Sequence, residues 1–315
     1  MTVVQQVLLE LEQDYVGHPY FVSGHALFSA LAQRVSSETA NRLQVSTGVF
    51  VPGTHGAYPD EHSQSRGKPY LGTSLPPVAS YDDLFVFRDA AQRWVSDGQP
   101  RDGENTLECR EYAGRVGFAS ATRFGRPVEA HQSKRTVNWY VQCYVHAGGS
   151  DAGVVPLDDA VLDGLRVGGA RNYGFGETSL ADTQTVALED LDYSRVRAAD
   201  AHEIVLVSPF VTASECSGAD EQSVPWWWGV ERDDRLRRRA SRLVQGGDVF
   251  AVETIDHGQV VPYAGDDPVG TALNGVTRVG THSKFGFGEL RVRPANDDRV
   301  PRRAGDGEGL TGGVV

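Results

Sequence analysis

One twelve-residue segment occurs twice in this chain and carries the residues best suited to chemistry. Residues 166–177 read RVGGARNYGFGE and residues 278–289 read RVGTHSKFGFGE, so seven of twelve positions are identical. Each copy places a cation, Arg171 or Lys284, between a glycine and Gly-Phe-Gly-Glu. Such a cation can reach a phosphate, and the glycines permit positive φ and close approach of another molecule. The pattern predicts two loops that contact a phosphodiester backbone, one at the end of each half of the chain.

The elements around each copy exclude two common nucleotide-binding loops. A Walker loop needs Gly-Lys-Ser/Thr opening a helix, and a dinucleotide fingerprint needs a strand before the glycines and a helix after them. Here short helices are predicted before the copies, over 156–165 and 267–276, and strands are predicted after them. A plain tight turn between helix and strand stays open as the alternative use of the glycines.

Hydrophobic patterning predicts mostly strands that position these loops. A helix should begin at the N-cap Ser23 and run to Val35, packing Leu27 and Leu31 on the sheet of the first half. Residues 135–146 alternate as a strand with one buried face. Within 225–245, the sequence RDDRLRRRASRL at 232–243 is predicted as a basic helical segment. Further strands are predicted over residues 3–12, 45–51, 110–118, 183–188, 202–211, 248–255 and 290–292.

Composition limits the setting of the chain but not its ligand. Its 315 residues carry a net charge of −12, with 3 Lys against 27 Arg and 42 acidic residues. An acidic, lysine-poor surface is typical of adaptation to high salt, where attraction to phosphates is screened and binding must rely on direct contacts. No apolar run predicts a membrane span, and the N-terminus does not resemble a signal peptide, so we expect a cytoplasmic protein.

The three cysteines give no framework for a bound group. Cys109, Cys143 and Cys216 are isolated, odd in number and far from any C-x-x-C spacing. A disulfide scaffold or a zinc site is therefore not expected. We expect neither a metal nor another cofactor.

On these residues the chain resembles the RAMP (repeat-associated mysterious protein) superfamily of CRISPR systems. The resemblance rests on the loop ending in Gly-Phe-Gly between helix and strand, and on SGHALFSAL at 23–31, which looks like that superfamily's first turn and Ala-Leu-rich helix. GGDVFAVETID and RVGTHSKFGFGELRV, at 246–256 and 278–292, are similar to the C-terminal unit of the subgroup that caps the guide-RNA 5′ handle in type III effectors. One position departs from the fuller form, because Arg166 and Arg278 stand where that form has its first glycine.

The resemblance implies an α+β fold of two tandem ferredoxin-like (RRM-like βαββαβ) domains with antiparallel sheets and glycine-rich loops. These would span 1–193, with a long insertion at 52–77, and 194–293, before a disordered tail at 294–315. The implied function is an RNA-binding subunit of a CRISPR or CRISPR-like effector in antiviral defence, with guide or repeat RNA and other effector subunits as partners. The implied RNA-contacting residues are Gly168, Gly169, Arg171, Gly174 and Gly176 in the first copy, and Gly280, His282, Lys284, Gly286 and Gly288 in the second.

Two other functions stay open. The same superfamily includes metal-independent endoribonucleases of CRISPR repeats, in which a histidine near the N-terminus acts as general acid or base. His25 is the first candidate for that role here, and His55 is the second. The chain could instead be a structural interaction protein that does not touch RNA. Trp226, Trp227 and Trp228 fit either a hydrophobic packing patch or a surface on which bases stack.

Overall fold

The computed structural model is a mixed α+β protein made mostly of antiparallel strands. It describes residues 1–18, 21–53, 74–88, 109–124, 135–148, 153–217, 219, 221–230, 236–245 and 247–297. Most of the predicted insertion at 52–77, including His55, lies outside these residues, as does nearly all of the predicted tail. None of the helices in the described part of the chain is long and apolar enough to cross a membrane.

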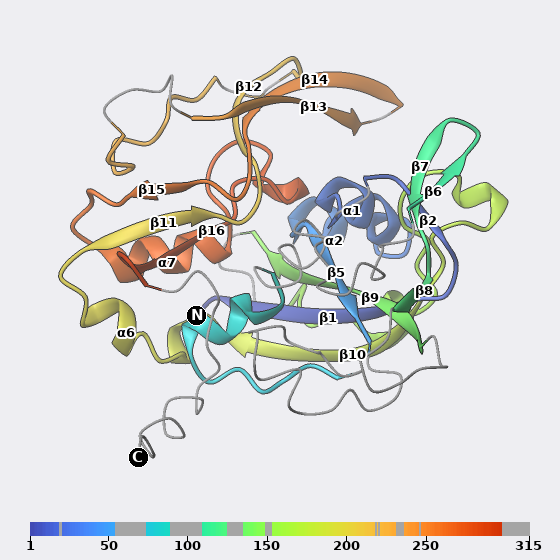
Figure 1. The fold of residues 1–315 in the computed structure, drawn as a ribbon, viewed down its shortest axis with the longest axis horizontal. Helices are drawn as coiled ribbons and strands as arrows, with labels where there is room; N and C mark the ends of the chain where they lie inside the picture. Colours follow the sequence, from blue (N-terminus) through green and yellow to red (C-terminus); the bar gives the residue numbers. More distant parts are fainter. Residues whose placement is uncertain are drawn as a thin grey trace.

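The first half is built around a seven-stranded antiparallel sheet (Figure 1). Its order is β10-β1-β9-β5-β3, and β4 and β8 also pair with β9. Helices α1, α2 and α5 belong to the same half. The elements are β1 Val3–Leu11, β3 Phe21–Val22, α1 Gly24–Ala32, α2 Ser37–Arg42, β4 Leu43–Val45, β5 Gly48–Pro52, β8 Ala121–Phe124, β9 Arg135–Ala147, α5 Asp159–Leu162 and β10 Thr178–Ala187.

Helix α1 begins where its sequence predicts and packs as expected. The Ser23 hydroxyl accepts a hydrogen bond from the Ala26 N–H, which is the N-cap interaction. Leu27 and Leu31 are fully buried against the first sheet, in the same cluster as the inward side chains of β9. Phe28 points elsewhere, toward Phe285 of the second half. Helix α1 is therefore covered on two sides, once by each half of the chain.

Strand β9 is buried on both faces, so the prediction of one buried face was wrong. Trp139, Val141 and Cys143 line the core beneath α1. Tyr140 and Tyr144, on the opposite face, are only 3% and 0% exposed. The segment 74–88 covers that second face, including the 3-10 turn η1 at Tyr81–Phe85. Alternation showed the strand, but the covering segment is distant in sequence and gives no local signal.

A small three-stranded sheet stands beside the first sheet. It consists of β2 Tyr15–Val16, β6 Cys109–Tyr112 and β7 Arg115–Phe118. The single strand predicted over 110–118 is in fact this β6–β7 hairpin. Its two turn residues, Ala113 and Gly114, have φ of 50° and 76°, as a tight hairpin turn requires.

The second half has two three-stranded sheets, β15-β11-β16 and β12-β14-β13. The strand predicted over 202–211 is interrupted, because the N–H groups of Val207 and Ser208 both donate to the Glu289 carbonyl and Pro209 has no N–H. Beyond this break β12 pairs with β14 instead of β16. The elements are α6 Ser194–Arg197, β11 His202–Leu206, β12 Phe210–Ser214, β13 Arg238–Gln245, β14 Asp248–Ile255, β15 Val260–Pro262, α7 Pro268–Val276 and β16 Leu290–Pro294.

The basic helix predicted within 225–245 was wrong, because residues 238–245 form strand β13. Every residue of β13 pairs with β14 across a tight hairpin. Leu243 is fully buried, in a cluster with Val252 and Phe285, while Arg238, Arg239 and Arg242 stay exposed. Pairing with β14 gives this segment both its hydrogen bonds and its apolar contact, and helix propensity does not outweigh them.

The two halves share one interior. The largest core cluster combines Val4 and Tyr144 from the first half with Ile204, Trp228 and Val292 from the second. In each half a short helix precedes the repeated segment and a strand follows it: α5 then β10, and α7 then β16. This confirms the predicted order of helix, glycine segment and strand.

Candidate nucleic-acid interface

From their first glycine to their last, the two repeated segments have positive φ at the same positions, so the repeat is structural as well as sequential. We call residues 168–176 the first loop and residues 280–288 the second loop. Ala170 and His282 hold equivalent positions with φ of 56° and 61°, and a 3-10 turn follows each. Gly174 and Gly286 end these turns with φ of 90° and 89°. The 3-10 turns are η2 Arg171–Tyr173 and η5 Ser283–Phe285.

The last glycine of each loop is required by the loop's own fold. A Cβ at Gly176 would lie 1.9 Å from the carbonyl oxygen of Val167, and one at Gly288 would lie 1.9 Å from that of Val279. Both glycines also have positive φ, 70° and 80°. Their backbone N–H groups donate to the carbonyls of Asp14 and Pro209, the residues just before strands β2 and β12. These two predicted RNA contacts therefore serve the turn, as the alternative use of the glycines predicts.

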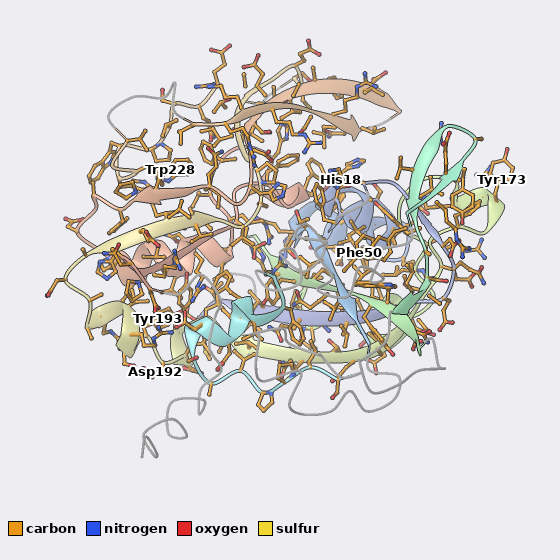
Figure 2. All side chains as sticks on the ribbon, viewed as in Figure 1. His18, Phe50, Tyr173, Asp192, Tyr193 and Trp228 are labelled. Atoms are coloured by element: carbon orange, nitrogen blue, oxygen red, sulfur yellow. The ribbon has the colours of Figure 1, made fainter. Side chains whose placement is uncertain are left out.

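The first loop presents its middle to solvent. Tyr173 is 79% exposed, and Figure 2 shows it at the edge of the molecule. Asn172 is exposed as well, and a Cβ added at Gly174 would meet nothing within 4 Å. The N–H of Gly169 donates to the Val16 carbonyl at 2.7 Å, so that group is already used. What remains for a ligand is the tip of the loop.

A cleft of about 760 Å³ opens beside the first loop and is lined by three arginines. Arg34, from the end of α1, donates to the carbonyls of Asp163 and Gly164, which fixes its guanidinium at the cleft. Arg166 lies 3.4 Å from Glu177, and both side chains are about half exposed. Arg171 comes from the loop itself. Gly168, Gly169 and Asn172 complete this side of the cleft.

The second loop is docked onto the first half of the protein. A Cβ at Gly286 would lie 2.8 Å from the Thr47 backbone nitrogen, and the Thr47 hydroxyl donates to the Gly286 carbonyl at 3.2 Å. The Lys284 ammonium donates to the Asn41 carbonyl at 3.3 Å and lies 4.7 Å from the centre of the Phe28 ring. Its partial burial lowers the Lys284 pKa. The loop cation that could meet a phosphate in the first copy faces protein in the second.

The ends of the second segment form a buried charged cluster. Glu289 is 0% exposed and lies 3.0 Å from the Nε of Arg88, which is 1% exposed. Burial raises the pKa of Glu289 and lowers that of Arg278 to about 10. Arg278 donates to the Ser283 carbonyl at 2.8 Å and to Nδ1 of His146 at 3.0 Å. Burial, with the Arg278 charge, lowers the His146 pKa to about 2, so His146 is neutral.

His25 lies on α1 against the second loop. Its ring meets that of Phe285 edge-on at 5.6 Å, and its Nε2 is 3.5 Å from the Ser29 hydroxyl. Burial lowers the pKa of His25, and the nearby Arg171 charge lowers it further, so the ring is neutral at pH 7. His282 belongs to the second loop itself, and its Nε2 lies 2.8 Å from the Ser214 hydroxyl.

A second histidine cluster joins the two halves and was not foreseen. His257 Nδ1 lies 2.9 Å from Asp256 Oδ1, and Arg237 is 3.1 Å from the other oxygen of that carboxylate. The His18 ring stacks on Phe21 at 3.8 Å, and burial lowers the His18 pKa to about 4. No spacing in the sequence links these residues, so only the fold could reveal them.

The tryptophans are divided between packing and surface. Trp228 is buried in the shared core, whereas Trp226 is 76% exposed. Trp227 is partly buried and lines a second cleft, of about 560 Å³, beside the start of the second loop at Gly280. Unlike the tryptophans, Tyr173 is not among the residues predicted from the sequence, although its alignment with Phe285 marks an aromatic position in the repeat.

Among the described residues, no group of three or more His, Cys, Asp or Glu side chains could hold a metal ion. The arrangement of the first loop offers cation contacts, amide contacts and one exposed ring. No model of a known protein family matches the chain, and no curated protein matches it.

Proposed function

We propose that the protein is an RNA-binding subunit of a CRISPR or CRISPR-like ribonucleoprotein effector, and that it holds the RNA backbone with its first loop. The observation that carries this proposal is the contrast between the two copies. The two loops share one backbone conformation, but only the first leaves its aromatic ring in solvent, because Tyr173 is 79% exposed and Phe285 is 9% exposed. The cation of the first loop, Arg171, lines a cleft, whereas Lys284 of the second contacts Asn41 and Phe28. The second copy shows that packing against the rest of the protein can bury the aromatic ring of this loop, so the exposed ring of the first copy marks it as available to a ligand.

The strand order supports a tandem of ferredoxin-like units. Following the chain, the principal elements of the first half are β1, α1, β5, β9, α5 and β10, and their sheet order is β10-β1-β9-β5. This order is the one expected of a βαββαβ unit, in which the last strand lies beside the first and the third lies between the first and second. In the second half, β16 pairs with β11, and β14 lies between β12 and β13. That half has α7 but no helix between β12 and β13 in its described residues.

The chemistry of the cleft beside the first loop suits RNA in high salt. Arg34, Arg166 and Arg171 bring guanidinium groups to one wall, and guanidinium binds phosphate by paired hydrogen bonds that persist when long-range attraction is screened. Tyr173 offers a ring on which a base can stack. The net charge of −12 does not oppose this, because binding depends on local contact groups.

The test compares the cations of the two loops, which stand one position apart in the aligned repeat. Binding of a labelled single-stranded CRISPR-repeat RNA is measured by fluorescence anisotropy across a salt series. Arg171→Ala combined with Tyr173→Ala should weaken binding roughly 5- to 150-fold, the range expected for loss of one stacked base. Loss of the Arg171 phosphate contact should also make the negative slope of log K against log salt less steep by about 0.7.

The matched control is Lys284→Ala, which removes the cation from the docked loop. It should leave RNA affinity within about twofold and instead lower the melting temperature. Tyr173 is exposed and Arg171 is partly exposed beside a cleft, so their double variant should melt close to the wild type. Equal loss of affinity in the two variants would contradict the assignment to the first loop. Unchanged binding in both would favour the structural interaction protein instead.

The endoribonuclease alternative has one observation in its favour. His25 is neutral, as a general base must be, and the Arg171 charge acts on it. Incubation of repeat RNA without metal tests this directly. Site-specific cleavage that His25→Ala abolishes would establish the enzyme, whereas binding without cleavage would leave the subunit role.

A further inference from the structure

The cleft beside the second loop is the strongest feature that the proposed function leaves unused. It lies between helix α7, the start of the second loop and the chain that leads into the tryptophans. Its volume of about 560 Å³ is within the range of small-molecule sites. The residues that define its chemistry are Phe210, Gln222, Pro225, Trp227, Asn274 and Gly280.

One wall is aromatic and held in place. The Trp227 ring packs against Trp228 at 6.0 Å and against Tyr263 at 6.3 Å between centroids. The backbone carbonyl of Trp227 accepts a hydrogen bond from the Ala264 N–H at 2.8 Å. The neighbouring Trp228 is buried in the core, and its backbone N–H donates to the Pro225 carbonyl at 3.0 Å. A ligand ring would therefore meet an indole whose backbone is already fixed.

The other walls supply neutral hydrogen-bonding groups. The exposed Asn274, from α7, carries an amide, which offers a donor and an acceptor in one plane, as the edge of a nucleobase does. The Gln222 amide donates to the Thr281 hydroxyl at 2.6 Å, which orients it at the mouth of the cleft. Among the lining residues that the structure describes there is no Lys, Asp or Glu. Arg278, the charged residue among them, already donates to Ser283 and His146. Such a cleft suits an uncharged planar ring rather than a phosphate.

The position of the cleft connects it with the RNA path. Gly280 lies at the cleft and is exposed, with φ of 91°. Its counterpart Gly168, with φ of 86°, lines the arginine cleft of the first loop. Equivalent places in the repeat thus carry two clefts, one lined by arginines and one by tryptophan.

We infer that the Trp227 cleft binds one unstacked nucleobase of single-stranded RNA, an inference that rests on the proposed function. The first loop would hold the backbone through charge, and the second cleft would hold a base through stacking and amide contacts. Duplication of the loop would then have produced two sites of different chemistry on one strand.

The experiment uses single-stranded repeat RNA with 2-aminopurine placed at each position in turn. One position should show a change in 2-aminopurine fluorescence on binding that Trp227→Ala removes. The same variant should weaken RNA binding roughly 5- to 150-fold and leave the salt slope unchanged, because no phosphate contact is lost. Trp226→Ala is the matched control and should stay within about twofold, because Trp226 does not line the cleft.

A second variant protects the test from a folding defect. Asn274→Ala changes an exposed side chain, so it should remove the position-specific fluorescence change without lowering the melting temperature. Trp227→Phe should restore part of the affinity. RNA binding that is sensitive to Arg171→Ala but indifferent to Trp227→Ala and Asn274→Ala would overturn the base site alone. A wild-type protein that binds no RNA would overturn the proposed function and this inference together. Saturable quenching of Trp227 fluorescence by neutral sugars, in a protein that binds no RNA, would have the same meaning.

Discussion

The two copies of the repeat differ most in the burial of the glutamate that ends each of them. Glu177 and Glu289 end the same twelve-residue segment. Glu177 has a side chain 42% exposed and lies 3.4 Å from Arg166, whereas Glu289 is 0% exposed and lies 3.0 Å from Arg88. The change Glu→Gln at either position removes the charge and keeps the shape.

The expected magnitudes differ because only one pair is shielded from water. Removing one partner of a buried ion pair leaves an uncompensated buried charge and costs about 3–5 kcal/mol of unfolding free energy. Within the described part of the chain, the oxygens of Glu289 accept no well-directed hydrogen bond, and the charges that favour its ionised form are those of Arg88 and Arg278. Loss of an exposed pair costs roughly 0.2–1 kcal/mol. Glu289→Gln should therefore destabilise the protein by at least about 2 kcal/mol more than Glu177→Gln.

The assay is urea unfolding at pH 7, followed by circular dichroism and tryptophan fluorescence. Coincident transitions with an unchanged slope would allow the midpoint shift to be read as a stability change. Replacing both members, Arg88→Met with Glu289→Met, should recover part of the loss, because an apolar pair needs no charge compensation while buried Arg278 still loses its counter-charge. Equal effects of the two single variants would refute the reasoning, since the contrast in burial would then carry no energetic weight.

Other variants test the loop backbone and the buried histidine. Gly176→Ala and Gly288→Ala should each lower the melting temperature more than Gly174→Ala, because an added Cβ meets a backbone carbonyl at the first two positions and open space at the third; equal shifts in calorimetry would contradict this. Gly174→Ala should cost only the 1–2 kcal/mol of a left-handed residue. The depressed pKa of His146, about 2, means that the unfolded chain takes up a proton below pH 6.5 while the folded chain does not. Stability should therefore be full above pH 6.5 and fall with decreasing pH by up to about 1.4 kcal/mol per unit, with a shallower fall in His146→Gln; unfolding titrations that show the same slope in both proteins would exclude His146 as the cause.

Much of the local structure around the repeat could be predicted from the sequence. The helix start at Ser23, the alternating strand β9 and the order of helix, loop and strand all depend on residues a few positions apart. The segment Arg238–Gln245 could not be predicted in the same way. Its cationic residues suit a helix when read alone, and its strand pairing depends on β14, which also fills the apolar cluster around Leu243.

The sequence by itself determined that the chain carries one loop design twice, because glycine positions and their positive φ values are local properties. Only the tertiary structure decided which copy is open. The aromatic of the first copy, Tyr173, remains in solvent, and that of the second, Phe285, is 9% exposed against α1 and β13. Burial depends on segments far away in the chain, including Thr47 and Arg88, whose contacts leave no trace in the spacing of the repeat. Two copies of one local motif can therefore become an exposed loop and a packed contact between the two halves of one protein.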